Sequence, residues 1–148
     1  MASFEPTIPG NGNETALLIS PEDDDHDILN TMFQRNGWTL KTADCLGSAS
    51  AVLRQMPISV VVTERDLPVG NWKDVLETTR HLRTVPLVIV ISRFADDYLW
   101  AEALNLGVYD VLLKPLDESE VVRVLTSAWI RMSPKKPKKV KGAVPETG

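Results

Sequence analysis

Residues 58–63 read ISVVVT and residues 87–91 read LVIVI. Both runs are apolar at consecutive positions and rich in β-branched residues, which is typical of strands covered on both faces. Between such runs lie longer segments with apolar residues at helical spacing, such as residues 23–36, where Leu29 and Met32 fall on one face. Strand and helix alternate five times, which predicts a parallel sheet with helices on both of its faces.

The expected strands cover residues 16–20, 38–42, 58–63, 87–91 and 108–113. The expected helices cover residues 23–36, 48–55, 72–82 and 95–106, and a last segment that begins at Asp117 or Ser119. Right-handed crossovers leave few topologies for five strand–helix units. The fold expected is therefore α/β, a doubly wound five-stranded parallel sheet of the flavodoxin-like (βα)5 type.

The chain has the length of one domain, with 148 residues of which 43% are hydrophobic and 24% charged. We expect a flexible N-terminal arm over residues 1–14, the domain over residues 15–132, and a basic disordered tail over residues 133–148. A single cysteine cannot form an internal disulfide, and no apolar run is long enough to span a bilayer. Together with a start that is unlike a signal peptide, this predicts a cytoplasmic protein without membrane contact.

The net charge of -4 conceals an asymmetry between body and tail. Residues 131–148 hold six of the 16 basic residues but only one of the 20 acidic ones. An acidic body is not typical of a nucleic-acid platform, so nucleic acid is not the expected partner. Binding of nucleic acid through the lysine-rich tail remains an alternative.

Parallel sheets of this type form their sites at the carboxyl ends of the strands, which directs attention to the loops there. Asp-Leu-Pro occupies residues 66–68, Ser92 ends the fourth strand, and GVYDVLLKP fills residues 107–115. This pattern resembles the receiver domain of two-component response regulators over roughly residues 15–132. The resemblance implies a signalling module rather than an enzyme, with a histidine kinase among its possible partners.

In the family, an acidic pair after the first strand holds Mg²⁺, and an aspartate at the end of the third strand accepts a phosphoryl group. A Thr or Ser after the fourth strand and a Lys before a Pro then contact that group. Ser92 and Lys114 match the last two positions in this chain. Counting back from Pro68 places Glu64 at the phosphoacceptor position, with Asp66 as a nearby alternative acceptor.

The remaining positions depart from the family pattern. Ser20 and Pro21 stand where the acidic pair is expected, with Glu22 and Asp23 just beyond them as weak metal candidates. The aspartates of residues 23–27 are otherwise expected to form a solvated face that complements the helix dipole. Val111 occupies the position of the aromatic switch residue. These departures are typical of a degenerate receiver, or pseudo-receiver.

The resulting hypothesis is a stand-alone receiver-like module that needs neither phosphorylation nor a cofactor and acts by protein–protein contact. We expect Glu64 to contact Lys114 directly, in a partly buried pair worth about 1 kcal/mol. The alternative within the family is an active, Mg²⁺-dependent phosphoacceptor that uses Asp66 or Glu64.

The expected working surface is the face between the fourth and fifth helices, used by a signalling partner or for self-association. The residues predicted for it are Tyr98, Trp100, Tyr109 and Val111. Exposed aromatic side chains are enriched among the residues that dominate binding at interfaces.

Overall fold

A computed structural model describes residues 14–133 of the chain. The predictions for the arm, residues 1–14, and for the basic tail, residues 133–148, fall outside this range except at one residue each. Within the described residues, no helix has both the length and the apolar character needed to cross a bilayer.

Five strands and five helices alternate along the described residues. The strands are β1 (Thr15–Ile19), β2 (Thr39–Ala43), β3 (Val60–Glu64), β4 (Leu87–Ser92) and β5 (Asp110–Leu113). The helices are α1 (Asp23–Arg35), α2 (Leu46–Gln55), α3 (Trp72–Thr79), α4 (Asp97–Asn105) and α5 (Glu118–Met132).

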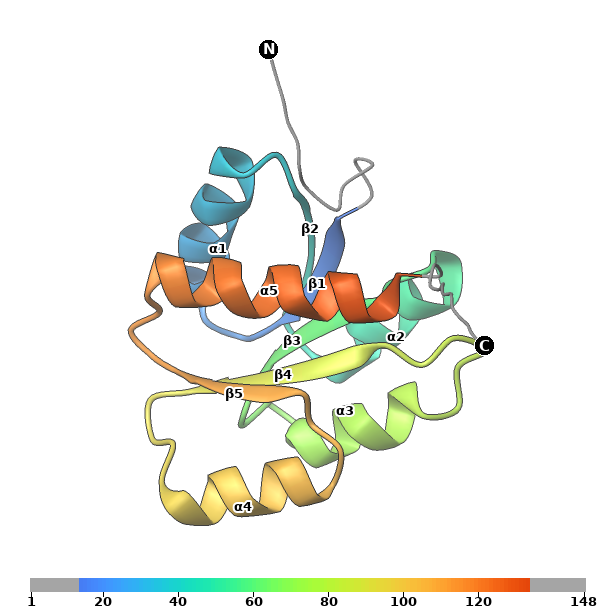
Figure 1. Cartoon of the computed structure of the whole chain (residues 1–148). Helices are drawn as coiled ribbons and strands as arrows, with labels where there is room; N and C mark the ends of the chain where they lie inside the picture. Colours follow the sequence, from blue (N-terminus) through green and yellow to red (C-terminus); the bar gives the residue numbers. More distant parts are fainter. Residues whose placement is uncertain (1–13, 134–148) are drawn as a thin grey trace, which may run out of the picture.

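All strands belong to one parallel sheet in the order β2-β1-β3-β4-β5 (Figure 1). The chain runs from β1 outward to β2, and then crosses to the other side of β1 to add β3, β4 and β5. The predicted doubly wound fold is confirmed. The order reverses between β1 and β3, and the loops that follow these two strands therefore lead to helices on opposite faces of the sheet.

Helices α1 and α5 cover one face of the sheet, and α2, α3 and α4 cover the other (Figure 1). The alternation within each strand divides the core accordingly. In β1, Leu18 packs with the α1 and α5 residues, whereas Leu17 packs with α2 and α3. A smaller group around Trp72 and Leu99 fills the space beneath α4. Because both faces are covered, the central strands are apolar except near their ends, as their sequence predicted.

Several boundaries differ from the predictions by one to three residues. The second strand begins after Trp38, because the Trp38 N–H donates to the carbonyl of Phe33 and so belongs to the turn that ends α1. The fourth helix begins at Asp97, where the Asp96 side chain accepts from the Leu99 N–H and caps the helix. The third helix ends at Thr79 instead of residue 82.

Candidate functional site

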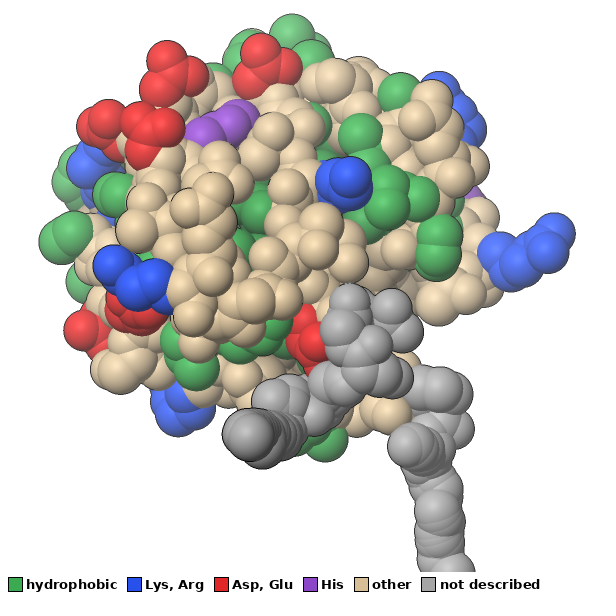
Figure 2. All heavy atoms as spheres, turned by 90° about the horizontal axis from the view of Figure 1, so that it is seen from above, with side chains coloured by type: hydrophobic (Ala, Val, Ile, Leu, Met, Phe, Trp, Pro, Cys, Tyr) green, Lys and Arg blue, Asp and Glu red, His purple; other side chains and the backbone are tan. Residues whose placement is uncertain are grey.

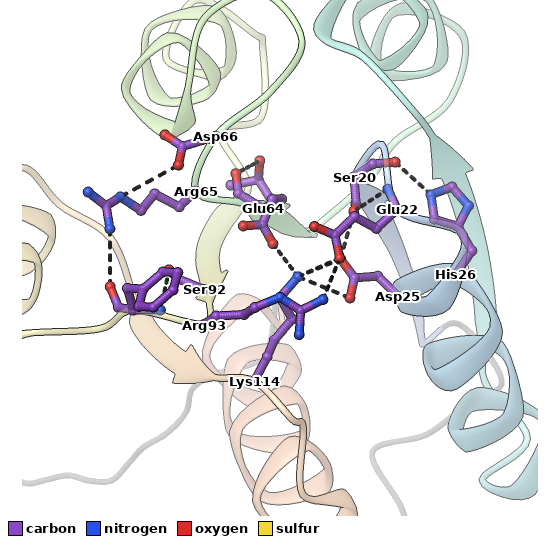
Figure 3. A network of polar contacts seen from close by, with 12 residues as sticks. Ser20, Glu22, Asp25, His26, Glu64, Arg65, Asp66, Ser92, Arg93 and Lys114 are labelled. Atoms are coloured by element: carbon purple, nitrogen blue, oxygen red, sulfur yellow. Dashed lines mark hydrogen bonds and ion pairs between the residues drawn. The ribbon is translucent and has the colours of Figure 1, made fainter.

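A polar cluster lies at the carboxyl edge of the sheet, where the loops after four strands meet (Figure 3). Four buried polar residues mark the ends of these strands: Ser20 after β1, Glu64 in β3, Ser92 in β4 and Lys114 after β5. The sequence predicted all four as pocket residues, and the fold places each of them at this edge.

Lys114 lies at the centre of the cluster. Its Nζ is 2.6 Å from Glu64 Oε2 and 3.0 and 3.2 Å from the two carboxylate oxygens of Asp25. Glu22 Oε1 lies 3.3 Å away on the open side. The Asp25 and Glu22 contacts are hydrogen bonds, whereas the Glu64 contact has the distance of an ion pair without the angle of a hydrogen bond. Three carboxylates therefore share one ammonium group.

The predicted contact between Glu64 and Lys114 is present, but the expectation that it would be only partly buried is wrong. The two side chains are 11% and 4% exposed. Glu64 is the last residue of a strand that is buried on both faces, and the carboxylate of Asp25 occupies the other side of the ammonium. The value for an exposed pair does not apply, because removing one partner of a buried pair leaves an uncompensated charge.

Asp25 contradicts the prediction that the aspartates of residues 23–27 form a solvated face, because it is only 2% exposed. Its carboxylate accepts a 2.7 Å hydrogen bond from Ser20 Oγ in addition to its contacts with Lys114. A signal was available, because Asp25 lies four residues before Leu29 and thus on the apolar side of α1.

Burial and charge act in opposite directions on the two partners. Burial raises the pKa of the Glu64 carboxyl above its usual value, with a contribution from the neighbouring carboxylates, and Lys114 only partly offsets this. For Lys114, burial alone would lower the pKa, but the contacts with Glu64 and Asp25 outweigh burial and raise it. The ammonium therefore stays charged over the physiological range.

Glu22 forms the outer wall of the cluster. Its Oε1 accepts a 2.9 Å hydrogen bond from the Arg93 guanidinium as well as the bond from Lys114. Both side chains are substantially exposed, at 39% for Glu22 and 56% for Arg93. This pair links the loop after β1 with the loop after β4, but its exposure limits its strength.

The Ser92 hydroxyl is directed toward its own loop. Ser92 Oγ accepts a hydrogen bond from the backbone N–H of Phe94 at 3.0 Å. The Arg65 guanidinium donates to the carbonyl of the same Phe94 at 3.1 Å. The loop between β4 and α4 is thus tied to the end of β3 and to the end of β4.

Three other predicted residues lie outside the cluster. Asp66, the alternative acceptor, is highly exposed and sits 3.9 Å from the Arg65 guanidinium, on the far side of Glu64 from Asp25 (Figure 3). Asp23 and Pro21 are also exposed. Within residues 14–133, no hydrogen bond or ion pair joins any of the three to Lys114.

The residues at this edge do not fit a magnesium ion held as the resemblance implies. The Ser20 hydroxyl is bound to Asp25, Pro21 offers no carboxylate, and Glu22 is engaged by Lys114 and Arg93. Mg²⁺ requires nearly octahedral oxygen ligands at about 2.0–2.1 Å. Throughout the described part of the chain, no three acidic, histidine or cysteine side chains are grouped to hold a metal ion.

The predicted working surface is corrected at two of its four residues. Val111 is buried beneath α4, because the alternation in β5 turns it toward Leu99 and Ala103. Tyr98 is exposed but lies on the α3 side of α4, where it lines a cleft of about 180 Å³ together with Trp72 and other residues.

The other two predicted residues stay on the surface between α4 and α5. Trp100 is 36% exposed, and Leu104, one helical turn further along α4, is also exposed. The hydroxyl of Tyr109 is hydrogen bonded to Ser127 of α5, and the Arg131 guanidinium lies 6.0 Å from its ring. The exposed Leu113 of β5 adds a further apolar side chain.

The surface seen from above in Figure 1 differs in character. Figure 2 shows that acidic side chains gather toward one end of this view and that basic ones are scattered. The first turn of α1 contributes the exposed Asp23 and Asp24.

The fold and the site together define a receiver-like signalling domain. The sheet is doubly wound, and at its carboxyl edge an acidic side chain faces the lysine of a Lys-Pro pair. The sequence matches the response regulator receiver domain family over residues 17–126, and the chain belongs to that family. Receiver domains are modules of two-component systems that interact with histidine kinases and other signalling proteins.

Among its relatives is the photosynthetic apparatus regulatory protein RegA of Cereibacter sphaeroides, which is 27% identical over 126 residues. These residues cover 83% of this chain and 67% of RegA. The response regulator protein PilR of Pseudomonas aeruginosa is 23% identical over 115 residues, or 78% of this chain and 26% of PilR. The chain therefore spans between about a quarter and two thirds of the length of these relatives.

Solved structures support the same fold. The beryllofluoride-activated NtrC4 receiver domain dimer has a TM-score of 0.75 at 20% identity, covering 81% of this chain and 99% of that one. The receiver domain of the Francisella response regulator 1452 also has a TM-score of 0.75, at 21% identity, covering 82% of this chain and 100% of that one.

Proposed function

We propose that this receiver domain signals without phosphoryl transfer and acts by direct contact with another signalling protein. The observation that carries the proposal is the buried contact of Lys114 with Glu64 and Asp25. In the family, this lysine pairs with the phosphoryl group. Here its charge is already matched by carboxylates of the protein itself.

The chemistry of the acceptor position supports the same conclusion. Phosphoryl transfer depends almost entirely on positioning and on neutralisation of charge. Glu64 is one methylene longer than aspartate, and a misplacement of about 1 Å can cost roughly 100-fold in rate.

We propose the surface formed by α4, β5 and α5 as the contact site. Trp100 and Leu104 of α4 and Leu113 of β5 are exposed apolar side chains there, and Tyr109 is held against α5. Exposed apolar side chains that lie together are typical of protein interfaces. The occupant is a signalling protein or a second copy of this chain, and a histidine kinase is one candidate. The cytoplasm stays the predicted compartment.

The test is intact-mass measurement of the wild-type protein after incubation with acetyl phosphate and Mg²⁺. We expect no species heavier by about 80 Da, the mass of one phosphoryl group. A receiver with an aspartate at the acceptor position serves as the positive control for the donor. An added phosphate that disappears in Glu64→Gln or Asp66→Asn would establish the alternative, an active phosphoacceptor.

A further inference from the structure

We infer that Lys114 is the resident cation of this pocket, and that its ammonium group occupies the point where Asp25, Glu64 and Glu22 converge and thereby keeps divalent cations out. The inference deepens the proposed function and rests on it in part. It concerns what fills the pocket, whereas the proposed function concerns whether a phosphoryl group is transferred.

The distances around Nζ are those of an ammonium site. Four carboxylate oxygens from three residues lie between 2.6 and 3.3 Å from this atom. Charge-assisted N–H···O bonds are about 2.7–2.9 Å long, whereas oxygen ligands lie at about 2.0–2.1 Å from Mg²⁺ and 2.3–2.6 Å from Ca²⁺. Three of the four oxygens, at 3.0–3.3 Å, therefore lie too far from this point for a metal ligand, and the set suits an ammonium group.

The carboxylates are fixed in this arrangement by further bonds. Asp25 is held by the Ser20 hydroxyl at 2.7 Å, and Glu22 by the Arg93 guanidinium at 2.9 Å. Asp25 and Glu64 are both buried. The Lys114 side chain is only 4% exposed. A metal ion could therefore reach the carboxylate oxygens of Asp25 and Glu64 only if the Lys114 ammonium first left the site.

The charge balance explains why the site would accept a cation if Lys114 were absent. Glu22, Asp25 and Glu64 supply three negative charges, which Lys114 and Arg93 reduce to an excess of one. Without the Lys114 charge the excess becomes two, in a largely buried place where unpaired charges are costly. A divalent cation is the simplest replacement, because its hard charge suits carboxylate oxygens, and these oxygens must move closer together than they lie around Lys114 to bind it.

The experiment measures melting temperatures of the wild-type protein and of Lys114→Gln, with and without about 10 mM Mg²⁺ or Ca²⁺. We expect Lys114→Gln to melt lower than the wild type and to gain about 5 °C or more with at least one cation, since a ligand that binds only the folded state stabilises it. The wild type should shift by less than about 1 °C under the same conditions.

Two further variants serve as controls. Lys114→Gln combined with Asp25→Asn removes a converging carboxylate and should lose the rescue. Lys73→Gln removes an exposed lysine that pairs with Glu102 away from the pocket, and it should show no rescue. A rescue equal in wild type and Lys114→Gln, or no rescue of a folded Lys114→Gln, overturns the inference.

A second measurement applies if Lys114→Gln does not fold. Mn²⁺ is titrated into isotope-labelled wild-type protein, and paramagnetic broadening of amide signals is recorded. We expect the signals of Asp25, Glu64 and Lys114 to stay sharp. Selective broadening of these three signals would show that a cation enters beside Lys114, which the inference excludes. Because neither measurement involves phosphorylation, this inference and the proposed function can fail separately.

Discussion

Lys114 Nζ lies 3.0 Å from Asp25 Oδ2, although the two residues are 89 positions apart in the chain. The bond joins the first turn of α1 to the loop that leads from β5 into α5. It thus connects the beginning and the end of the fold across the carboxyl edge of the sheet. Both side chains are almost fully buried, so removing one partner of this contact costs more stability than removing one partner of an exposed ion pair elsewhere on the domain.

Replacing Asp25 should destabilise the domain considerably more than replacing Glu22. Asp25→Asn removes a buried negative charge that binds both Lys114 and Ser20, and we expect a loss of about 2 kcal/mol in the free energy of unfolding. Glu22→Gln changes a side chain that is 39% exposed and should cost less than about 1 kcal/mol. Urea unfolding of the two variants measures the difference, and equal losses would contradict the ranking.

The raised pKa of Glu64 predicts a specific dependence of stability on pH. The folded protein holds the Glu64 proton more tightly than the unfolded chain does, so its contribution to stability is present at low pH. That contribution is lost as the pH rises from the ordinary value of about 4.3 through the folded pKa.

Glu64→Gln isolates this effect, because the variant lacks the titrating group. The free energy of unfolding of the wild type, minus that of Glu64→Gln, should fall as the pH rises through this window. Urea unfolding at several pH values from about 4 to 7 measures it. A difference that grows with pH would mean that the pKa of Glu64 is lowered in the folded state.

Trp100→Ala should weaken contact with the partner or with a second copy of the chain. A large aromatic side chain at the centre of an interface typically contributes about 2 kcal/mol or more, equivalent to roughly 30-fold in affinity. Sedimentation velocity measures self-association, and a pull-down with the intact protein measures capture of a partner.

Tyr98→Ala is the matched control for this prediction, because Tyr98 is an exposed aromatic residue of the same helix but lies on its α3 side. We expect it to leave binding unchanged. Binding that depends on Tyr98 and not on Trp100 would move the working surface to the cleft between α3 and α4.

Restoring the aspartate alone should not restore phosphorylation. In Glu64→Asp the acceptor has the family's length, but Ser20 and Pro21 still provide no carboxylate for a metal, and Asp25 still binds Lys114. Intact-mass measurement with acetyl phosphate and Mg²⁺ should find Glu64→Asp unlabelled. Labelling of this single variant would mean that the acceptor's length, and not the surroundings of Lys114, limits the chemistry.

The fold could be predicted from local pattern because each element carries its own signal. The β-branched run that became β3 and the apolar run that became β4 are unambiguous, and strict alternation of strands and helices leaves few ways to arrange a parallel sheet. The first and last residues of the helices and strands were predicted less accurately, because they depend on capping contacts such as the one between Asp96 and Leu99.

The positions of Glu64 and Lys114 could also be predicted from the sequence, because the resemblance to receiver domains places each at a set distance from a proline near the end of a strand. The role of Asp25 was not. In sequence it is one of several aspartates at the start of a helix, and helix dipole and solvent account for such a run equally well. Its spacing to Leu29 places it on the apolar side of α1, but only the packing of α1 against the sheet brings its carboxylate to Ser20 and Lys114, while Asp23 and Asp24 stay exposed. The tertiary structure decided which charges are buried together, because burial depends on the relative placement of elements that lie far apart in the chain.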